Sequence, residues 1–155
     1  MKILVFSDSH RSQADMIEAI DEQKPDQVIH LGDLISDAED LTYVYPRLPI
    51  CMVPGNCEGW TTVPAKKLIT LQGKRILLSH GHLWGVKGGY DKAIGEARKS
   101  GVDILLFGHT HKPLVDKRGK TLFVNPGSIG DWARPFYAVV TLENGRLDGR
   151  TFPLA

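Results

Sequence analysis

Short apolar runs alternate with segments of helical periodicity through the first third of the chain. The run at residues 2–6 (KILVF) ends in polar residues, which is typical of a strand buried on both faces. Residues 12–24 have helical spacing, with Ser12 as the expected N-cap and Pro25 as the expected stop. The same alternation predicts a strand at 27–31, a helix at 37–45 and a strand at 50–53. This β-α-β-α-β order predicts a parallel sheet with crossover helices.

Turn signals dominate the rest of the chain. Three pairs of short strands are each joined by a turn that contains glycine, at 66–80 around Gln72-Gly73, at 114–124 around Arg118-Gly119 and at 137–152 around Asn144-Gly145. A helix over 90–100, closed by Gly101, and a buried strand over 103–107 lie between the first two pairs. The pattern predicts one mixed α/β domain over residues 1–155, with parallel strands in front and antiparallel hairpins behind.

Composition is that of an ordinary globular protein, with 42% hydrophobic and 24% charged residues. The formal net charge of +1 provides no basic surface for a nucleic-acid polymer, so none is expected as a partner. Cys51 and Cys57 form no CxxC pair, which argues against a zinc knuckle or a disulfide framework. No signal peptide and no apolar run of membrane-spanning length is recognised, so we expect a cytoplasmic protein that does not bind membranes.

Residues that commonly bind metals follow five of the predicted strands. They are Asp8 and His10, Asp33, Asn56, His80 and His82, and His109 and His111. Ligands of open α/β sheets gather beyond the carboxyl ends of the strands, so these side chains are expected in one crevice. The Asp-x-His and His-x-His spacings suit this, because alternate residues of an extended chain project the same way. Gly32, Gly55 and Gly108 are expected to let the backbone turn sharply there.

The mixture of imidazole and carboxylate groups indicates first-row divalent metals and disfavours calcium, which prefers oxygen ligands alone. Eight candidate ligands exceed a single tetrahedral site but suit two ions that share a carboxylate. Ion pairs about 3.5–4 Å apart are the usual arrangement for phosphoester cleavage. Two divalent ions are therefore predicted, with Mn²⁺ as the expected metal and Ni²⁺, Fe²⁺, Co²⁺ and Zn²⁺ left open.

The five motifs together carry a family resemblance. They are DSH at 8–10, GD at 32–33, GNCE at 55–58, SHGH at 79–82 and GHTH at 108–111. The series closely resembles the calcineurin-like metallophosphoesterase superfamily and, within it, the small single-domain bacterial and archaeal phosphodiesterases. The resemblance extends from Lys2 to about Thr151 and includes NPGS at 125–128. It implies an α/β fold, an αββα sandwich of two mixed β-sheets flanked by helices.

The resemblance also implies a role for each ligand. One ion would be held by Asp8, His10 and His111, the other by Asn56, His80 and His109, with Asp33 bridging the two. A hydroxide activated by the two metals would attack phosphorus in line, and the substrate would be a small phosphodiester. Asp33 and Asn56 would then serve catalysis as well as metal binding. Replacing Asp33 with asparagine should lower activity by orders of magnitude.

Cys57 is a departure from the wider superfamily, where many members carry histidine directly after the motif asparagine as an acid for the leaving group. A thiol with a pKa of about 8.5 is a poor substitute for imidazolium at neutral pH. The small phosphodiesterases resemble this chain in having cysteine there, so esters with good leaving groups are expected. His82 either supplies the missing proton or supports a neighbouring metal ligand.

Several of these residues have a plainer structural explanation. Asp8, Asp33 and Asn56 taken singly would be explained by capping and turn formation, and only the whole group makes that explanation weak. His30, within VIHLGD, is expected to point into the interior with a hydrogen bond to the backbone, and is excluded as a ligand. Three tryptophans follow motif residues, and they either line a cleft or pack loops: Trp60, Trp84 and Trp132.

Three other functions remain alternatives. A phosphomonoesterase would use the same metals, with specificity set by the shape of the cleft. A retromer subunit of this fold serves as a protein-binding scaffold, but its ligand positions are partly altered, whereas every position here holds a competent ligand. A nuclease is disfavoured by the near-neutral charge. The natural substrate stays open among a cyclic nucleotide, another small diester and a phosphoprotein, and a homo-oligomer is neither required nor excluded.

Overall fold

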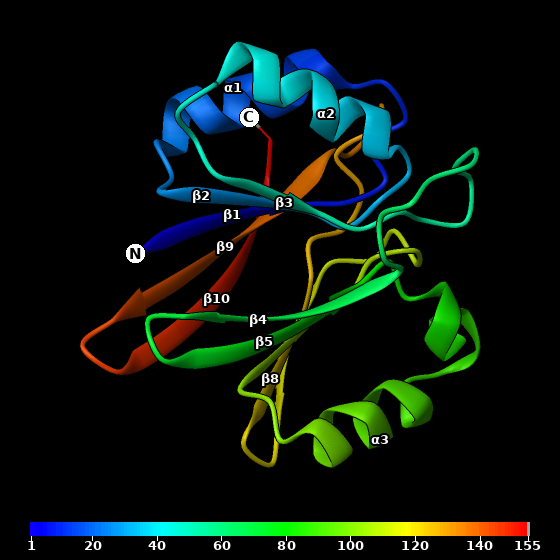
Figure 1. Cartoon of the computed structure of the whole chain (residues 1–155), viewed down its shortest axis with the longest axis vertical. Coiled ribbons are helices and arrows are strands. Elements are labelled where there is room, and N and C mark those ends of the chain that lie inside the picture. Colours follow the sequence, from blue (N-terminus) through cyan, green and yellow to red (C-terminus); the bar gives the residue numbers. More distant parts are fainter. Residues whose placement is uncertain (155) are drawn as a thin grey trace.

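The computed structural model describes residues 1–154 as four stacked layers: two helices, two β-sheets and a third helix (Figure 1). The first sheet has the order β10-β9-β1-β2-β3 and contains β1 (Lys2–Phe6), β2 (Gln27–His30), β3 (Ile50–Met52), β9 (Phe136–Glu143) and β10 (Arg146–Pro153). The second has the order β4-β5-β6-β8-β7 and contains β4 (Lys66–Leu71), β5 (Lys74–Ser79), β6 (Ile104–Leu106), β7 (Leu114–Arg118) and β8 (Thr121–Asn125).

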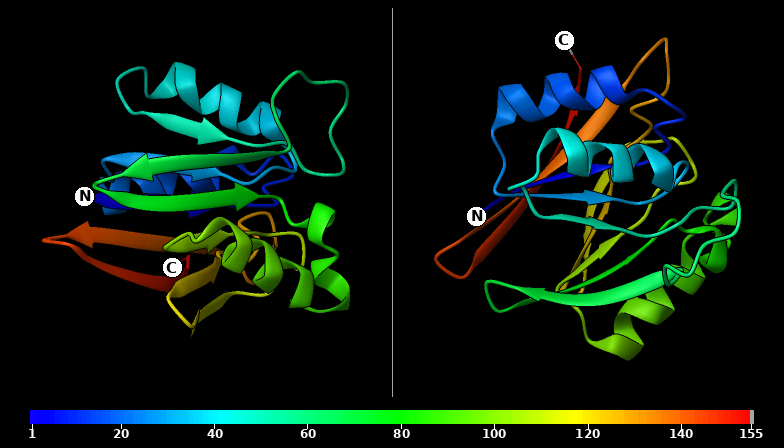
Figure 2. Two further views of the ribbon diagram at one scale, coloured as in Figure 1. Left: turned by 60° about the horizontal axis from the view of Figure 1, so that its bottom comes forward. Right: turned by 45° about the horizontal axis from the view of Figure 1, so that its top comes forward.

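Both sheets are mixed, because each has a parallel centre and antiparallel additions. Strands β1, β2 and β3 are parallel, and the β9–β10 hairpin adds to them through an antiparallel β1–β9 pair. In the second sheet β5, β6 and β8 are parallel, while β4 and β7 are antiparallel edges. Helices α1 (Gln13–Gln23) and α2 (Ile35–Val44) cover the first sheet, and α3 (Asp91–Ser100) covers the second (Figure 2). The predicted sandwich of two mixed sheets is confirmed.

Strand β1 illustrates why the apolar runs are continuous. Ile3 and Val5 face the core between the two sheets, whereas Leu4 and Phe6 face the core beneath α1 and α2. All four are 0% exposed. Burying one such side chain contributes roughly 1.5–3 kcal/mol, so a strand that buries both faces has no position at which a polar residue is favourable. The first polar residues therefore come where the strand ends.

The element boundaries agree with the predicted ones to within a residue or so, except at α2. This helix was predicted over 37–45 and begins instead at Ile35. The amide of Ile35 donates a hydrogen bond of 2.8 Å to the carboxylate of Glu58, which lies in another loop. Because Glu58 is distant along the chain, it can satisfy a free N–H group at the start of the helix without any capping signal in the neighbouring sequence. At α1, Ser12 occupies the N-cap position, but its side chain makes no capping hydrogen bond.

The loops that follow β1, β2, β5 and β6 are joined by backbone hydrogen bonds. The amide of Asp8 donates to the carbonyl of Gly32 at 2.9 Å, and the amide of Gly108 donates to the carbonyl of His80 at 2.7 Å. Two short 3₁₀ turns, His82–Trp84 and Val86–Gly88, connect this region to α3. Within residues 1–154, no helix is long and apolar enough to cross a membrane.

Candidate metal centre

The structure brings six of the seven predicted metal ligands into contact. Two groups of candidate ligand atoms each lie within 4.8 Å of one another. One group comes from Asp8, His10 and His111, and the other from Asp8, Asp33 and His80. His109 joins the second group, because its Nδ1 lies 3.1 Å from Nε2 of His80. Asp8 therefore belongs to both groups. The assignment of Asp33 as the bridging ligand stays a prediction.

Asp8 presents a buried oxygen that the protein leaves without a hydrogen bond. Its Oδ2 accepts hydrogen bonds from the Ser7 hydroxyl at 2.6 Å and from the His109 amide at 3.1 Å. Its Oδ1 has no well-formed hydrogen bond to any described residue. Three imidazole nitrogens surround this oxygen: Nε2 of His111 at 3.2 Å, of His80 at 3.6 Å and of His10 at 4.0 Å. An orphaned carboxylate oxygen ringed by imidazoles fits a bound cation.

His80 shows the same requirement from the nitrogen side. Its Nδ1–H donates to the carbonyl of Leu31 at 2.8 Å, because a carbonyl can only accept. In neutral His80 the other nitrogen, Nε2, then carries a lone pair, and it faces Oδ2 of Asp33 at 3.4 Å as well as Asp8. Lone pairs that face one another repel unless a cation lies between them. A metal-binding histidine typically donates its second N–H group to a carbonyl or carboxylate in this way.

The surroundings of the centre shift the pKa of Asp8 and of three neighbouring histidines. Burial raises the pKa of the Asp8 carboxyl, but the nearby imidazole of His111 and the charge of His80 outweigh it, so this pKa lies below its ordinary value. The nearby carboxylate of Asp8 raises the pKa of His111. Burial, followed by the charge of His80, lowers the pKa of both His82 and His109. The surroundings of His111 thus favour its protonated form, whereas those of His82 and His109 favour neutral imidazole, the form that binds metals.

The backbone of the centre corrects one sequence expectation. Extended chain was expected to align the ligands of each motif, but five of them have a positive φ in the left-handed region: Asp8 at 54°, His10 at 40°, Asp33 at 58°, His109 at 71° and His111 at 61°. The side chains therefore converge from tight turns. Left-handed backbone is unfavourable for L-residues by roughly 1–2 kcal/mol, and such strain gathers at functional sites.

Glycines allow the close approach of these turns, as expected. A side chain on Gly32 would collide with the backbone of Gly55, and one on Gly55 would collide with the carboxylate of Asp33. A side chain on Gly108 would collide with Ser7. The loops thus meet at distances that only glycine permits.

Asn56 and Cys57 lie beside the centre on an exposed loop. The Asn56 side chain makes no hydrogen bond to another residue within 1–154, so its role as a ligand stays a prediction. The amide of Cys57 donates to Oδ1 of Asp33 at 3.0 Å. Hydrogen bonding to the Asp33 carboxylate raises the pKa of the Cys57 thiol, with a smaller contribution from burial. The thiol therefore stays protonated at neutral pH and is a weak acid.

His82 lies next to the ligand histidines. Its ring centroid is 5.6 Å from that of His80 and 6.3 Å from that of His109. Its Nδ1 is buried and has no hydrogen-bond partner among the described residues. These positions are compatible with both roles that the sequence left open, proton donor and support for a metal ligand.

Glu58 is a residue that the sequence analysis missed. One of its carboxylate oxygens, Oε2, accepts hydrogen bonds from three backbone amides, of Asp33 at 2.7 Å, Ile35 at 2.8 Å and Gly55 at 3.2 Å. The carboxylate therefore ties the loop after β2 to the loop after β3. The only available signal was its place at the end of the GNCE motif.

His30 lies in the interior, as expected, and organises a second buried network. Its Nδ1 accepts a hydrogen bond of 3.0 Å from the amide of Gly32, so the proton sits on Nε2, which is 2.9 Å from the Ser9 hydroxyl. That hydroxyl donates to Asp37 at 2.6 Å. Burial lowers the pKa of His30 to about 4, so the ring is neutral at pH 7. The network fixes Ser9, which stands between Asp8 and His10, and the sequence had not indicated Asp37.

The motif NPGS supports the same loops from the second sheet. The Ser128 hydroxyl donates to the carbonyl of Asp8 at 2.8 Å, and the Asn125 amide group donates to the Thr110 hydroxyl at 2.9 Å. The first contact holds the backbone of a candidate ligand, and the second holds the side chain of Thr110, which lies between the candidate ligands His109 and His111.

The three tryptophans separate into two kinds. Trp84 is 3% exposed and packs beneath α3, whereas Trp60 and Trp132 are 91% and 94% exposed. Loop packing therefore explains only Trp84.

Comparisons with known proteins agree with this geometry. The model of the calcineurin-like phosphoesterase superfamily domain matches residues 1–145. A probable metallophosphoesterase of Bacillus subtilis, YsnB, is 33% identical over 150 residues, which cover 93% of this chain and 86% of that protein. Phosphodiesterase YfcE of Escherichia coli is 27% identical over 156 residues, covering 83% of this chain and 79% of YfcE.

Solved structures show the same fold. A protein from Streptococcus pneumoniae described as a predicted phosphoesterase matches 98% of this chain and 88% of its own, with 30% identity and a TM-score of 0.81. Vps29 of Entamoeba histolytica, in complex with Zn²⁺, matches all of both chains with 22% identity and a TM-score of 0.77, a likeness of fold alone. Taken with the ligand groups around Asp8, these matches establish that the chain belongs to the calcineurin-like phosphoesterase superfamily and support its activity as a metal-dependent phosphoesterase.

Proposed function

We propose that this protein hydrolyses small phosphodiesters at a centre of two divalent metal ions, with Mn²⁺ as the preferred ion. The observation that carries the proposal is the buried Oδ1 of Asp8, which accepts no well-formed hydrogen bond and is ringed by three imidazole nitrogens. Carboxylate and imidazole ligands suit manganese and its first-row neighbours. The phosphodiesterase activity named for YfcE supports the choice of substrate class.

The protein side chains divide between two adjacent sites. His10 and His111 form one candidate ligand group with Asp8, and His80 and Asp33 form a second group with the same residue. We assign His109 and Asn56 to the second group. Two ions bound there would neutralise charge on the phosphoryl oxygens and make a water molecule acidic enough to react near neutral pH, so no side-chain base is required.

The remaining residues position these ligands and assist the leaving group. Glu58 holds the backbone of Asp33, and Leu31 fixes the ring of His80 by accepting its Nδ1–H. Cys57 and His82 are the two side chains available to protonate the leaving group. The Cys57 thiol is a weak acid because Asp33 raises its pKa, and burial lowers the pKa of His82. Esters whose leaving groups need little protonation should therefore be the better substrates.

The experiment is a comparison of bis(p-nitrophenyl) phosphate with p-nitrophenyl phosphate, using metal-stripped protein with and without Mn²⁺. Turnover that requires Mn²⁺ and favours the diester is expected. Asp33→Asn should lower turnover by orders of magnitude, while the control Asp148→Asn, in an exposed pair with Arg150 on β10, should not. Preference for the monoester would change the proposed substrate class to phosphomonoesters but would leave the proposed metal centre standing. Failure to bind Mn²⁺ would refute the proposal and favour a scaffold function.

A further inference from the structure

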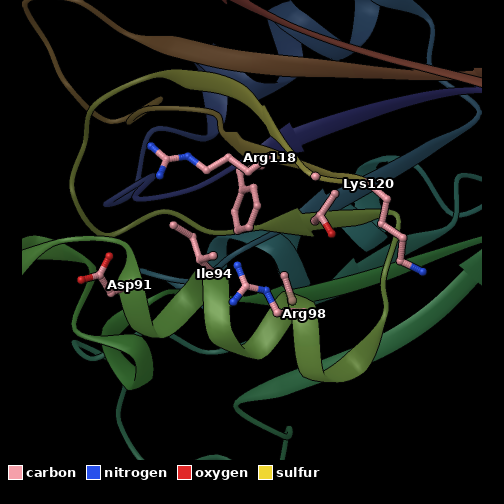
Figure 3. A pocket seen from close by; sticks show the side chains of 9 residues that line it. Asp91, Ile94, Arg98, Arg118 and Lys120 are labelled. Atoms are coloured by element: carbon pink, nitrogen blue, oxygen red, sulfur yellow. The ribbon is translucent and has the colours of Figure 1, made fainter.

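A pocket of about 550 Å³ lies between α3 and the β7–β8 hairpin, and none of the predicted metal ligands lines it (Figure 3). This volume falls within the range of roughly 300–1,000 Å³ that is common for small-molecule sites. The pocket exists because one helix covers a five-stranded sheet, which leaves a depression beside α3 over the outer face of β7 and β8.

The floor of the pocket is apolar. Phe123 of β8 is 3% exposed and belongs to the core cluster under α3, and Ile94 packs against the same cluster. Ala97 completes the helix side of the floor. An aromatic ring and aliphatic side chains favour the flat, apolar part of a ligand.

The walls carry positive charge from two different elements. Figure 3 shows Arg98 on α3 and Arg118 on β7 on facing sides of the pocket, with Asp91 towards one end. Nε of Arg118 donates to Asp116 at 2.8 Å, which orients the side chain and leaves its terminal nitrogens free to bind. Arg98 makes no ion pair within residues 1–154.

The side chains that line the pocket therefore carry a net positive charge. Arg98, Arg118 and Lys120 contribute three positive charges, Asp91 contributes one negative charge, and the Asp116 carboxylate paired with Arg118 contributes another, which leaves a net charge of +1. A phosphate monoester is close to a dianion at neutral pH. The planar guanidinium group matches phosphate oxygens with paired hydrogen bonds, and Arg98 and Arg118 supply two of these groups to the lining.

We propose that this pocket binds a small molecule that carries a phosphate monoester on an aromatic or apolar body, of the nucleoside monophosphate class. The phosphate lies between Arg98 and Arg118, and the body rests on Phe123 and Ile94. The site is separate from the metal centre, so it does not depend on the proposed reaction.

The test is calorimetric titration of metal-stripped protein, in the presence of chelator, with AMP, inorganic phosphate and adenosine. Removing the metals prevents phosphate from binding at the metal centre. AMP is expected to bind more tightly than either fragment, because each fragment makes only part of the contacts. The double variant Arg98→Gln/Arg118→Gln should weaken AMP binding by at least about tenfold.

Arg150→Gln is the matched control. Its Nε donates to Asp148 at 3.2 Å, two residues before it, in the same arrangement as Arg118 and Asp116 but away from the pocket. Unchanged AMP affinity in this variant supports the site. If the double variant does not fold, Arg98→Gln alone serves, because Arg98 is exposed and unpaired in the described chain. No AMP binding by the wild-type protein, or equal weakening in Arg150→Gln, would overturn the proposal. Equal affinity for AMP and phosphate would refute the proposal that the apolar floor binds the body of the ligand.

Discussion

The carboxylate of Glu58 is predicted to stabilise both the fold and the metal centre. Three backbone amides, of Asp33, Ile35 and Gly55, donate to one of its oxygens at 2.7, 2.8 and 3.2 Å. A hydrogen bond to a charged group contributes about 1.5–3 kcal/mol, so at the lower end the three sum to about 4.5 kcal/mol. Glu58 is partly exposed, and water can replace some of this in a truncated variant. We therefore expect Glu58→Ala to lower the free energy of unfolding by about 3 kcal/mol.

A graded series separates charge from the loss of the acceptor. Glu58→Gln keeps an oxygen of similar reach but loses the charge, which reduces each bond to about 1 kcal/mol and should cost about 1.5 kcal/mol in all. Glu39→Gln is the control, because Glu39 lies on the exposed side of α2 and its side chain makes no hydrogen bond within residues 1–154. Urea unfolding of the metal-free proteins measures these differences.

The same variants should weaken Mn²⁺ binding. Glu58 holds the backbone of Asp33, and residues that orient metal ligands typically contribute 10–100-fold to metal affinity. Calorimetric titration with Mn²⁺ should therefore show weaker binding in the order wild type, Glu58→Gln, Glu58→Ala. If Glu58→Ala unfolded within about 0.5 kcal/mol of the wild type and bound Mn²⁺ equally well, the reasoning would be wrong.

Three further predictions concern residues around the centre. Because burial lowers the pKa of His30 to about 4 from 6.5, only the unfolded state takes up its proton between these values; stability of the metal-free protein is therefore lost as pH falls from 6.5 towards 4. Between pH 7 and pH 4, His30→Gln should reduce this loss in the free energy of unfolding by about 3 kcal/mol, as measured by urea unfolding at the two pH values. A pH dependence equal to that of the wild type would contradict this. Gly108→Ala should destabilise by about 2–3 kcal/mol, because the added methyl group collides with Ser7, and an unchanged melting temperature would exclude the clash. Trp84→Ala should cost about 3–5 kcal/mol and the exposed Trp132→Ala no more than about 0.5 kcal/mol, so similar losses in thermal melts would disprove the difference in packing.

The sequence was sufficient to predict the layers and the position of the centre. In β1, continuous burial excludes polar residues until the strand ends, so Asp8 marks both the end of the strand and the start of the centre. Hairpin turns such as Asn144-Gly145 depend on local backbone conformation, and φ is positive at both residues. These features depend on neighbours along the chain, which is why their boundaries were predicted closely.

The contacts that hold the centre together were not predictable in this way. Glu58 bonds to the amide of Ile35 and Asp37 to the hydroxyl of Ser9, and each pair is more than twenty residues apart. An isolated acidic residue in a loop or helix has no periodicity that reveals such a partner. The left-handed turns at Asp8 and His109 were also missed, because the spacing of the motifs fits extended and turned backbone equally well.

The centre draws its candidate ligands from both sheets: Asp8 and Asp33 follow strands of the first, and His80 and His109 follow strands of the second. Ions bound there would clamp the two halves of the sandwich, and an unfolded chain cannot hold Asp8 and His109 together across a sequence separation of 101 residues. By mass action, free metal at a hundred times its dissociation constant would stabilise the native state by about 2.7 kcal/mol. Metal supply in the cell would thus govern the lifetime of the folded protein as well as its turnover.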